Sequence, residues 1–215
     1  MLQAGCNSDE PVRIKDAEYF PLQTGFYQIY DIEEILYSAF NPPESLLYEL
    51  KVEIVDSFTN GEGGTTYVLH RSTRNDQNEP WSYRESWSAR TTTQFAIETE
   101  GNTSYVKLVF PLQSGAHWNG NSLNDLGEDE YEIEGMGQLF NAGNGVSFDN
   151  CIVVNQNNES NLVFKDERTE VYSPGMGLVY KESSVWEYNC TGGSCSGQIT
   201  SGRYLKQVLK DHGQN

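Results

Sequence analysis

Positive charge is scarce in this 215-residue chain. Only 14 residues are Lys or Arg, against 31 Asp or Glu, so the formal net charge is −17. Nucleic-acid binding depends on clustered Lys and Arg, and we therefore expect no nucleic-acid partner. The same balance disfavours adhesion of the protein surface itself to anionic lipid. We interpret the acidity as that of a soluble exported protein, with a cationic partner or Ca²⁺ as the alternative explanation.

Residues that could carry catalysis are also few. The three histidines stand at positions 70, 117 and 212, and nucleophilic catalysis most often needs a histidine beside the nucleophile. Gly193–Gly197 superficially resembles a nucleophile elbow but lacks the strand-to-helix context of that motif. No glycine-rich phosphate loop is present. The sequence therefore predicts no catalytic residue, no cofactor and no enzymatic activity.

The four cysteines stand at positions 6, 151, 190 and 195. Cys190 and Cys195 enclose Thr-Gly-Gly-Ser, a loop flexible enough for the two sulfurs to meet, and a disulfide is predicted there in an oxidising compartment. Free thiols are one alternative. A metal half-site is another, but no second Cys or His pair lies nearby, and we predict no metal site.

What the chain does have is a two-residue alternation of apolar and polar side chains. In the clearest run six apolar residues share one parity: Leu46, Tyr48, Leu50, Val52, Ile54 and Phe58. The stretch 170–190 repeats the pattern after the turn formers Ser173–Gly177, which places Lys181 and Ser183 on the polar face. Such alternation is typical of half-buried strands. Turn-forming residues separate similar runs along much of the chain, with a turn expected over 156–161. Residues 203–209 fit either a helix or a strand, and a final strand is favoured.

The fold predicted from this pattern is all-β. We expect a single antiparallel meander of about ten strands, closed into a barrel or half-barrel of the lipoprotein-carrier or calycin type, with little helix. Residues 1–18 look like an N-terminal tether and 19–215 like one domain.

Two places are candidates for ligand binding. The long segment 111–129 interrupts the strand rhythm and carries His117, Trp118, Asn119 and Asn121, where an indole could stack on a sugar and the amides could bind its hydroxyls. The alternative is a Trp that plugs the barrel end. Trp81 and Trp87 lie on a predicted strand nearby.

The densest acidic run is Asp125–Glu134. Its carboxylates make a Ca²⁺ site conceivable, because hard cations prefer several oxygen ligands. The run lacks the spacing of an EF-hand loop, and we interpret it as a solvated acidic loop.

The N-terminal Ala4-Gly5-Cys6 resembles the lipobox of bacterial lipoproteins. In that family Leu usually stands where this chain has Gln3, and a signal peptide precedes the Cys; five residues are too short for one, so the start is interpreted as truncated. No window approaches 18 consecutive apolar residues, so no transmembrane helix is predicted. The resemblance implies that Cys6 is lipidated and that the membrane is reached only through this anchor.

A second resemblance covers most of the chain. Tyr-Phe-Pro-Leu-x-x-Gly-x-Tyr-x-x-Tyr at 19–30 and Tyr-Ser-Pro-Gly-Met-Gly-Leu-Val-Tyr-Lys-Glu at 172–182 resemble a group of uncharacterised Gram-negative lipoproteins. Membership would imply a β-rich exported domain in the cell envelope, in the periplasm or on the outer-membrane surface. These motifs imply no reaction.

The resulting expectation is a monomeric, non-enzymatic envelope lipoprotein that binds an apolar or glycan ligand in an aromatic-lined barrel mouth. One alternative is a structural lipoprotein that binds a protein partner through strand edges or the 111–129 segment. The other is a hydrolase that uses two carboxylates, although no acidic pair is singled out by the sequence.

Overall fold

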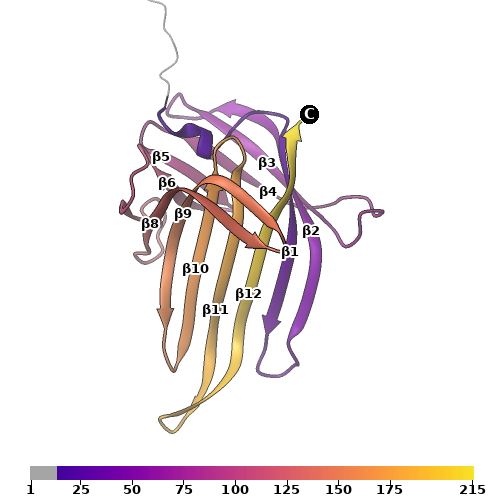
Figure 1. Cartoon of the computed structure of the whole chain (residues 1–215), viewed down its shortest axis with the longest axis vertical. Coiled ribbons are helices and arrows are strands. Elements are labelled where there is room, and N and C mark those ends of the chain that lie inside the picture. The colour runs from indigo at the N-terminus through magenta and orange to yellow at the C-terminus, as the bar shows by residue number, and fades with distance from the viewer. Residues whose placement is uncertain (1–13) are drawn as a thin grey trace, which may run out of the picture.

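The computed structural model describes residues 14–215, and these form one antiparallel sheet of twelve strands (Figure 1). The all-β class is confirmed, with twelve strands in place of about ten. The first six strands are β1 (Phe26–Tyr37), β2 (Glu44–Thr59), β3 (Thr65–Arg74), β4 (Ser82–Thr91), β5 (Phe95–Glu100) and β6 (Thr103–Val109). The other six are β7 (His117–Asn119), β8 (Glu130–Gly143), β9 (Val146–Ser160), β10 (Phe164–Ser173), β11 (Gly177–Thr191) and β12 (Ser194–Gln214).

Helix is almost absent from the described part of the chain. It consists of one 3₁₀ turn, η1 (Ala17–Tyr19), just before the barrel. Within 14–215 there is accordingly no helix with the length and apolar character needed to cross a bilayer.

The sheet consists of two meanders joined in its middle. The strand order is β6-β5-β4-β3-β2-β1-β12-β11-β10-β9-β8-β7. The first and last strands are therefore neighbours, in register from Phe26 opposite Gln214 to Tyr37 opposite Gly202. Because the chain passes from β6 to β7, the two outer edges of the sheet must approach one another.

The edges meet at β6 and β7 and nearly close the sheet into a barrel. The backbone N–H of Val106 donates to the carbonyl of Gly120 over 2.9 Å. The indole Nε1 of Trp118 donates to the carbonyl of Val106 over 2.8 Å. Trp118 thus helps to hold the two edges together.

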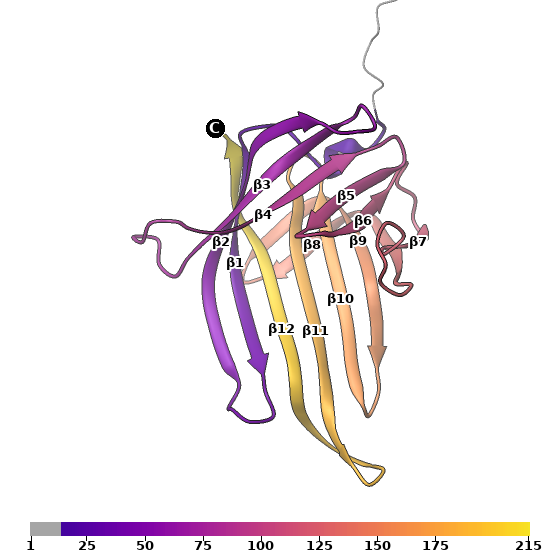
Figure 2. The same ribbon diagram turned by 180° about the vertical axis from the view of Figure 1, so that it is seen from behind.

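In the orientation of Figure 1, the lower half of the barrel wall is incomplete. Residues 44–48 of β2 pair with β1, but the pairing of β2 with β3 starts only at Glu49. Residues 156–160 of β9 lie beyond the last β8 pair, at Asn155. Figures 1 and 2 show the β1–β2, β9–β10 and β11–β12 hairpins extending together past the other strands. The wall is therefore open between the two free strand edges.

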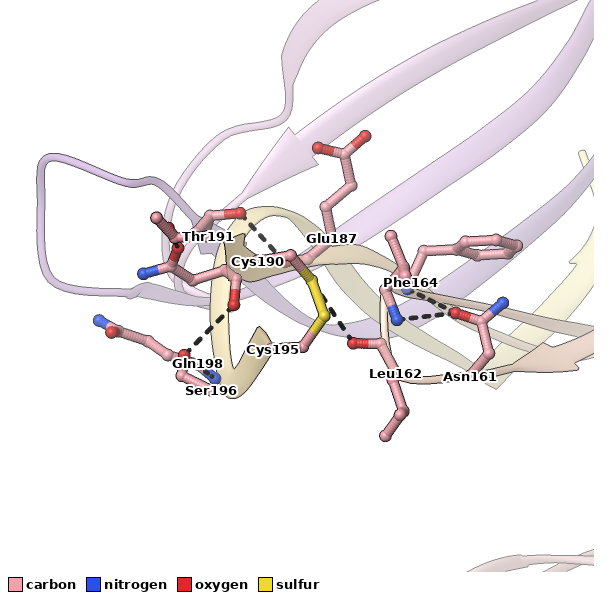
Figure 3. The surroundings of a disulfide bond; sticks show 12 residues. Asn161, Leu162, Phe164, Glu187, Cys190, Thr191, Cys195, Ser196 and Gln198 are labelled. Atoms are coloured by element: carbon pink, nitrogen blue, oxygen red, sulfur yellow. Dashed lines mark hydrogen bonds between the residues drawn. A yellow bond between two sulfur atoms is a disulfide. The ribbon is translucent and has the colours of Figure 1, made fainter. Parts of the chain in front are cut away.

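The disulfide lies at the tip of the β11–β12 hairpin (Figure 3). It joins the Sγ atoms of Cys190 and Cys195, which are also register partners. The neighbouring β9–β10 turn is held by Asn161, whose Oδ1 accepts hydrogen bonds from the backbone N–H groups of Val163 and Phe164.

β-Bulges correct two expectations drawn from strict alternation, and the strand pairing corrects a third, which was drawn from turn-forming residues. A bulge between Ile54 and Asp56 turns Phe58 outward, where it is 53% exposed, away from the other five residues of its run. A second, opposite Val171 and Tyr172, shifts β11 so that Lys181 and Ser183 line the barrel interior. The turn expected over 156–161 is also wrong, because 156–160 continue β9 and pair with β10 around a third bulge.

The apolar core occupies the upper part of the barrel. It includes the inward residues Leu50, Ile54, Leu69, Val179 and Leu209, with Phe20 and Leu22 from the loop before β1 packed against it. The far ends of β8 and β9 pass in front of β10 to β12 in Figure 1 and cover their outer face. There Phe140 packs on Tyr180 with ring centroids 4.9 Å apart. The lumen below it is lined mostly, though not only, by polar side chains.

Gly202 marks a close approach between β11 and β12. Its φ is +136°, and an added Cβ would collide with the carbonyl of Val185 and with Trp186. We expect Gly202→Ala to lower the free energy of unfolding by about 1–3 kcal/mol, as overpacking does. Gly61→Ala is the matched control, because a Cβ there meets nothing within 4 Å. Urea denaturation of both variants measures the difference, and equal stability would contradict the steric interpretation.

Candidate functional site

The barrel encloses a cavity of about 710 Å³. Residues from every strand except β7 line it, which places the cavity in the barrel lumen. Its size falls within the range of small-molecule sites, roughly 300–1,000 Å³. A ligand-sized space therefore lies below the apolar core.

The cavity wall is rich in charge, and its balance differs from that of the whole chain. The cationic residues in the lining are Arg71, Arg84, Lys107, Arg168, Lys181 and Arg203. The acidic residues are Glu34, Glu85, Glu98, Glu100 and Glu170. Six of the chain's 14 basic residues but only five of its 31 acidic residues thus line one cavity. The outer surface carries the acidity.

Glu170 is the centre of a buried charge cluster. Its Oε1 lies 2.6 Å from Lys107 Nζ and 3.0 Å from Lys181 Nζ. The hydroxyl of Tyr172 donates to its Oε2 over 2.6 Å. Burial alone would raise the pKa of Glu170, but the two lysines and these hydrogen bonds hold it well below its usual range. Two cations therefore share one ionised carboxylate.

Glu98 lines both the polar cavity and a second void of about 40 Å³, whose other lining residues include Ile54 and Leu69 of the apolar core. Among residues 14–215 its carboxyl has neither an ion-pair nor a hydrogen-bond partner. Burial raises the pKa of Glu98, although the charge of Lys107 acts in the opposite direction. The environment thus favours the protonated carboxyl.

The arginines of the wall differ in how completely they are engaged. Arg168 donates to both oxygens of Asp129, over 2.9 and 2.8 Å, and also pairs with Asp166. Arg71 instead lies flat on Trp87, with its guanidinium carbon 3.6 Å from the ring centroid. Its Nε is 3.4 Å from Glu85 Oε1 and makes no hydrogen bond. Arg71 therefore has donor capacity left over.

The binding residues expected in the 117–121 segment lie outside the cavity lining. Trp118 and Asn119 lie in β7, outside the lumen; Asn119 Oδ1 accepts from the backbone N–H groups of Asn121 and Asp129. The Asn121 amide donates to the carbonyl of Gly127 over 2.7 Å. His117, at the start of β7, is exposed beside Glu130 and Glu132. Ligand binding by this group stays a prediction.

The two other tryptophans separate as well. Trp87 lines the cavity, whereas Trp81 lies under the guanidinium of Arg74, 4.3 Å from its ring centroid, and is absent from the lining. Cys6 lies outside the described residues.

Two residues of the acidic run Asp125–Glu134 make side-chain contacts with neighbouring strands. Asp129 binds Arg168, and Glu134 accepts a hydrogen bond from the Asn155 amide. In the described range 14–215, no group of three or more His, Cys, Asp or Glu is arranged to hold a metal ion. The interpretation of Asp125–Glu134 as a solvated acidic loop in preference to a Ca²⁺ site stays a prediction.

The sequence did not point to the charged residues of the lumen. Lys107 stands between Val106 and Leu108 in a strand, and Arg203, Leu205 and Gln207 alternate on one parity of β12 yet all line the cavity. The sequence does carry one sign of these residues: a charged or amide side chain stands at a position whose neighbours two residues away are apolar. This sign can be interpreted only when the barrel interior is known to be polar.

These features define the class of protein as a nearly closed antiparallel β-barrel with a charged lumen. Its structure is similar to that of an exported protein with a YmcC-like fold from Bacteroides fragilis, at 13% identity and a TM-score of 0.48, over 91% of this chain and 98% of that one. A lipoprotein from Parabacteroides distasonis is similar at 13% identity and a TM-score of 0.46, with the same coverage of 91% and 98%. No protein-family profile matches the chain, and no curated protein matches it by sequence.

The Glu170 cluster yields a stability prediction. Lys107→Met should lower the free energy of unfolding by about 3 kcal/mol, the low end for breaking a buried pair, because Lys181 still faces Glu170. The loss should shrink as the pH falls below about 4, because the carboxyl then takes up a proton in the unfolded chain while it stays ionised in the wild-type fold, which reduces the stability that the lowered pKa provides.

Arg90→Met is the matched control. It breaks the pair of Arg90 with the exposed Glu62 and should change stability by about 0–1 kcal/mol. Urea denaturation of the two variants at pH 7 and pH 3.5 tests both statements. A loss for Lys107→Met that is independent of pH would show that the cluster is not held by charge.

Proposed function

We propose that the protein is a non-enzymatic binding protein of the cell envelope whose barrel lumen holds a glycan. The observation that carries this proposal is the cavity of about 710 Å³ with eleven charged side chains in its wall. An apolar ligand would remove those groups from water without replacing their hydrogen bonds, which costs roughly 1–3 kcal/mol for each polar group. The hydroxyls of a sugar both donate and accept hydrogen bonds.

Two further features support a saccharide. Tyr48, Tyr105 and Trp87 line the same cavity and offer rings on which a sugar could stack, each with a polar atom for its hydroxyls. The wall is open between residues 44–48 and 156–160, so that a chain longer than the cavity could extend outward. No such opening is needed for a ligand that is fully enclosed.

A Trp introduced at Ser183 tests the lumen as the binding site. Ser183 lines the cavity, so Ser183→Trp should fill it and abolish oligosaccharide binding without changing any charge. Ser201→Trp, on an exposed part of β12, should bind like the wild type. Isothermal titration with neutral and acidic trisaccharides provides the measurement. Binding that survives Ser183→Trp, or no binding by the wild type, would refute the proposal.

The envelope location rests on the lipobox-like segment, in which Cys6 would carry the lipid. The test is expression behind a complete lipoprotein leader, with radiolabelled palmitate in the medium. We expect label in the wild type and none in Cys6→Ser, whereas Cys151→Ser should keep it. Equal labelling of the Cys6 variant would contradict lipidation at this residue.

A second function, binding of a protein partner, is favoured by one observation. Residues 156–160 of β9 pair with β10 on one side, and no strand of the described chain pairs on the other. Free strand edges can accept an extended peptide as an added strand. The proposal is therefore kept as an alternative use of the same opening.

A further inference from the structure

Within the glycan-binding function proposed above, on which this inference rests, we infer that the ligand is an acidic saccharide whose carboxylates accept hydrogen bonds from Arg71, Gln156 and Lys181. The three residues lie in β3, β9 and β11 and line the lumen. A ligand that reaches all three must extend across the barrel interior.

The first argument is a surplus of buried donors. Four buried side-chain polar atoms in the described residues have no hydrogen-bond partner, and two of them belong to the cavity wall: Arg71 Nε and Gln156 Nε2. Both are donors. A buried polar group without a partner costs about 1–3 kcal/mol, so a ligand that supplies acceptor oxygens at these points is favoured.

Gln156 is placed for this role by the fold. It is only 4% exposed, and it is the extra residue of the bulge where Arg168 pairs with Asn157 and Thr169 with Asn155. As the extra residue of the bulge, Gln156 has no register partner in β10. Arg71 is likewise fixed, because its guanidinium is stacked on Trp87 and its Nε does not form a hydrogen bond with the nearby Glu85.

The second argument is the excess of positive charge at Glu170. Lys107 and Lys181 both contact this one carboxylate, and the side chain of Lys181 keeps 25% of its surface exposed. Lys181 can therefore pair with a ligand carboxylate and retain its contact with Glu170. Charge-assisted hydrogen bonds of this kind are about twice as strong as neutral ones.

The test uses trigalacturonate and the same trisaccharide with every carboxylate methyl-esterified. Isothermal titration of the wild type should show at least about tenfold tighter binding of the acid, the effect of a single charge-assisted bond. If both bind equally, the glycan-binding function stands and the acidic specificity is wrong. If neither binds, both proposals fail. Citrate that binds as tightly as trigalacturonate would show that a small carboxylate suffices and would overturn the saccharide class.

Two charge-altering variants locate the recognition. Gln156→Glu keeps the side-chain shape but replaces the donor with a carboxylate, and it should weaken trigalacturonate binding at least about tenfold. Gln198→Glu adds the same charge on an exposed site of β12 and should not. Unchanged affinity in Gln156→Glu would overturn the assigned role.

A third variant remains informative even if Gln156→Glu fails to fold. Glu100→Gln removes a carboxylate from the wall, so it should strengthen binding of trigalacturonate and leave binding of the methyl ester unchanged. Equal effects on the two ligands would show that the lumen does not select for negative charge.

Discussion

The ion-pair cluster at Glu170 is the interaction on which the closed barrel depends. Lys107 belongs to β6, at the outer edge of the first meander, whereas Glu170 and Lys181 belong to the second. The backbone contact between the meanders at β6 and β7 is short, because β7 has only three residues. The cluster therefore fixes the position of β6 against the opposite wall and sets the shape of the lumen beside it.

Burial of so much charge is not explained by stability. Replacement of a buried ion pair by apolar residues of similar volume is often neutral or stabilising, and the upper part of this barrel shows that its interior can be filled with Leu, Ile and Val side chains. The charged side chains of the lower interior therefore make the fold less stable than an apolar interior of similar volume would. Donors without partners at Arg71 and Gln156 add to that loss of stability. The proposed binding of a polar ligand would give both features a physical reason.

Particular residues show how far the sequence could lead. Alternation in β2 correctly placed Leu50, Val52 and Ile54 inside, because their neighbours on one parity are all apolar. The same rule failed at Phe58 and at Lys181, since a bulge inserts one residue and reverses the facing of everything beyond it. The segment around Trp118, which was expected to bind a ligand, lies outside the lumen lining. Its aromatic content gives no information about which strands enclose a cavity.

The sequence by itself determined the all-β class, most strand positions and the lack of a recognisable catalytic motif, because each depends on local periodicity, turn residues or composition. Only the tertiary structure decided that the two meanders meet at β1 and β12, and that the interior is polar. It also brought together Lys107 and Glu170, which are 63 residues apart in the chain. Such contacts depend on bulges, sheet curvature and closure, which accumulate over twelve strands and leave no mark in any short window of sequence.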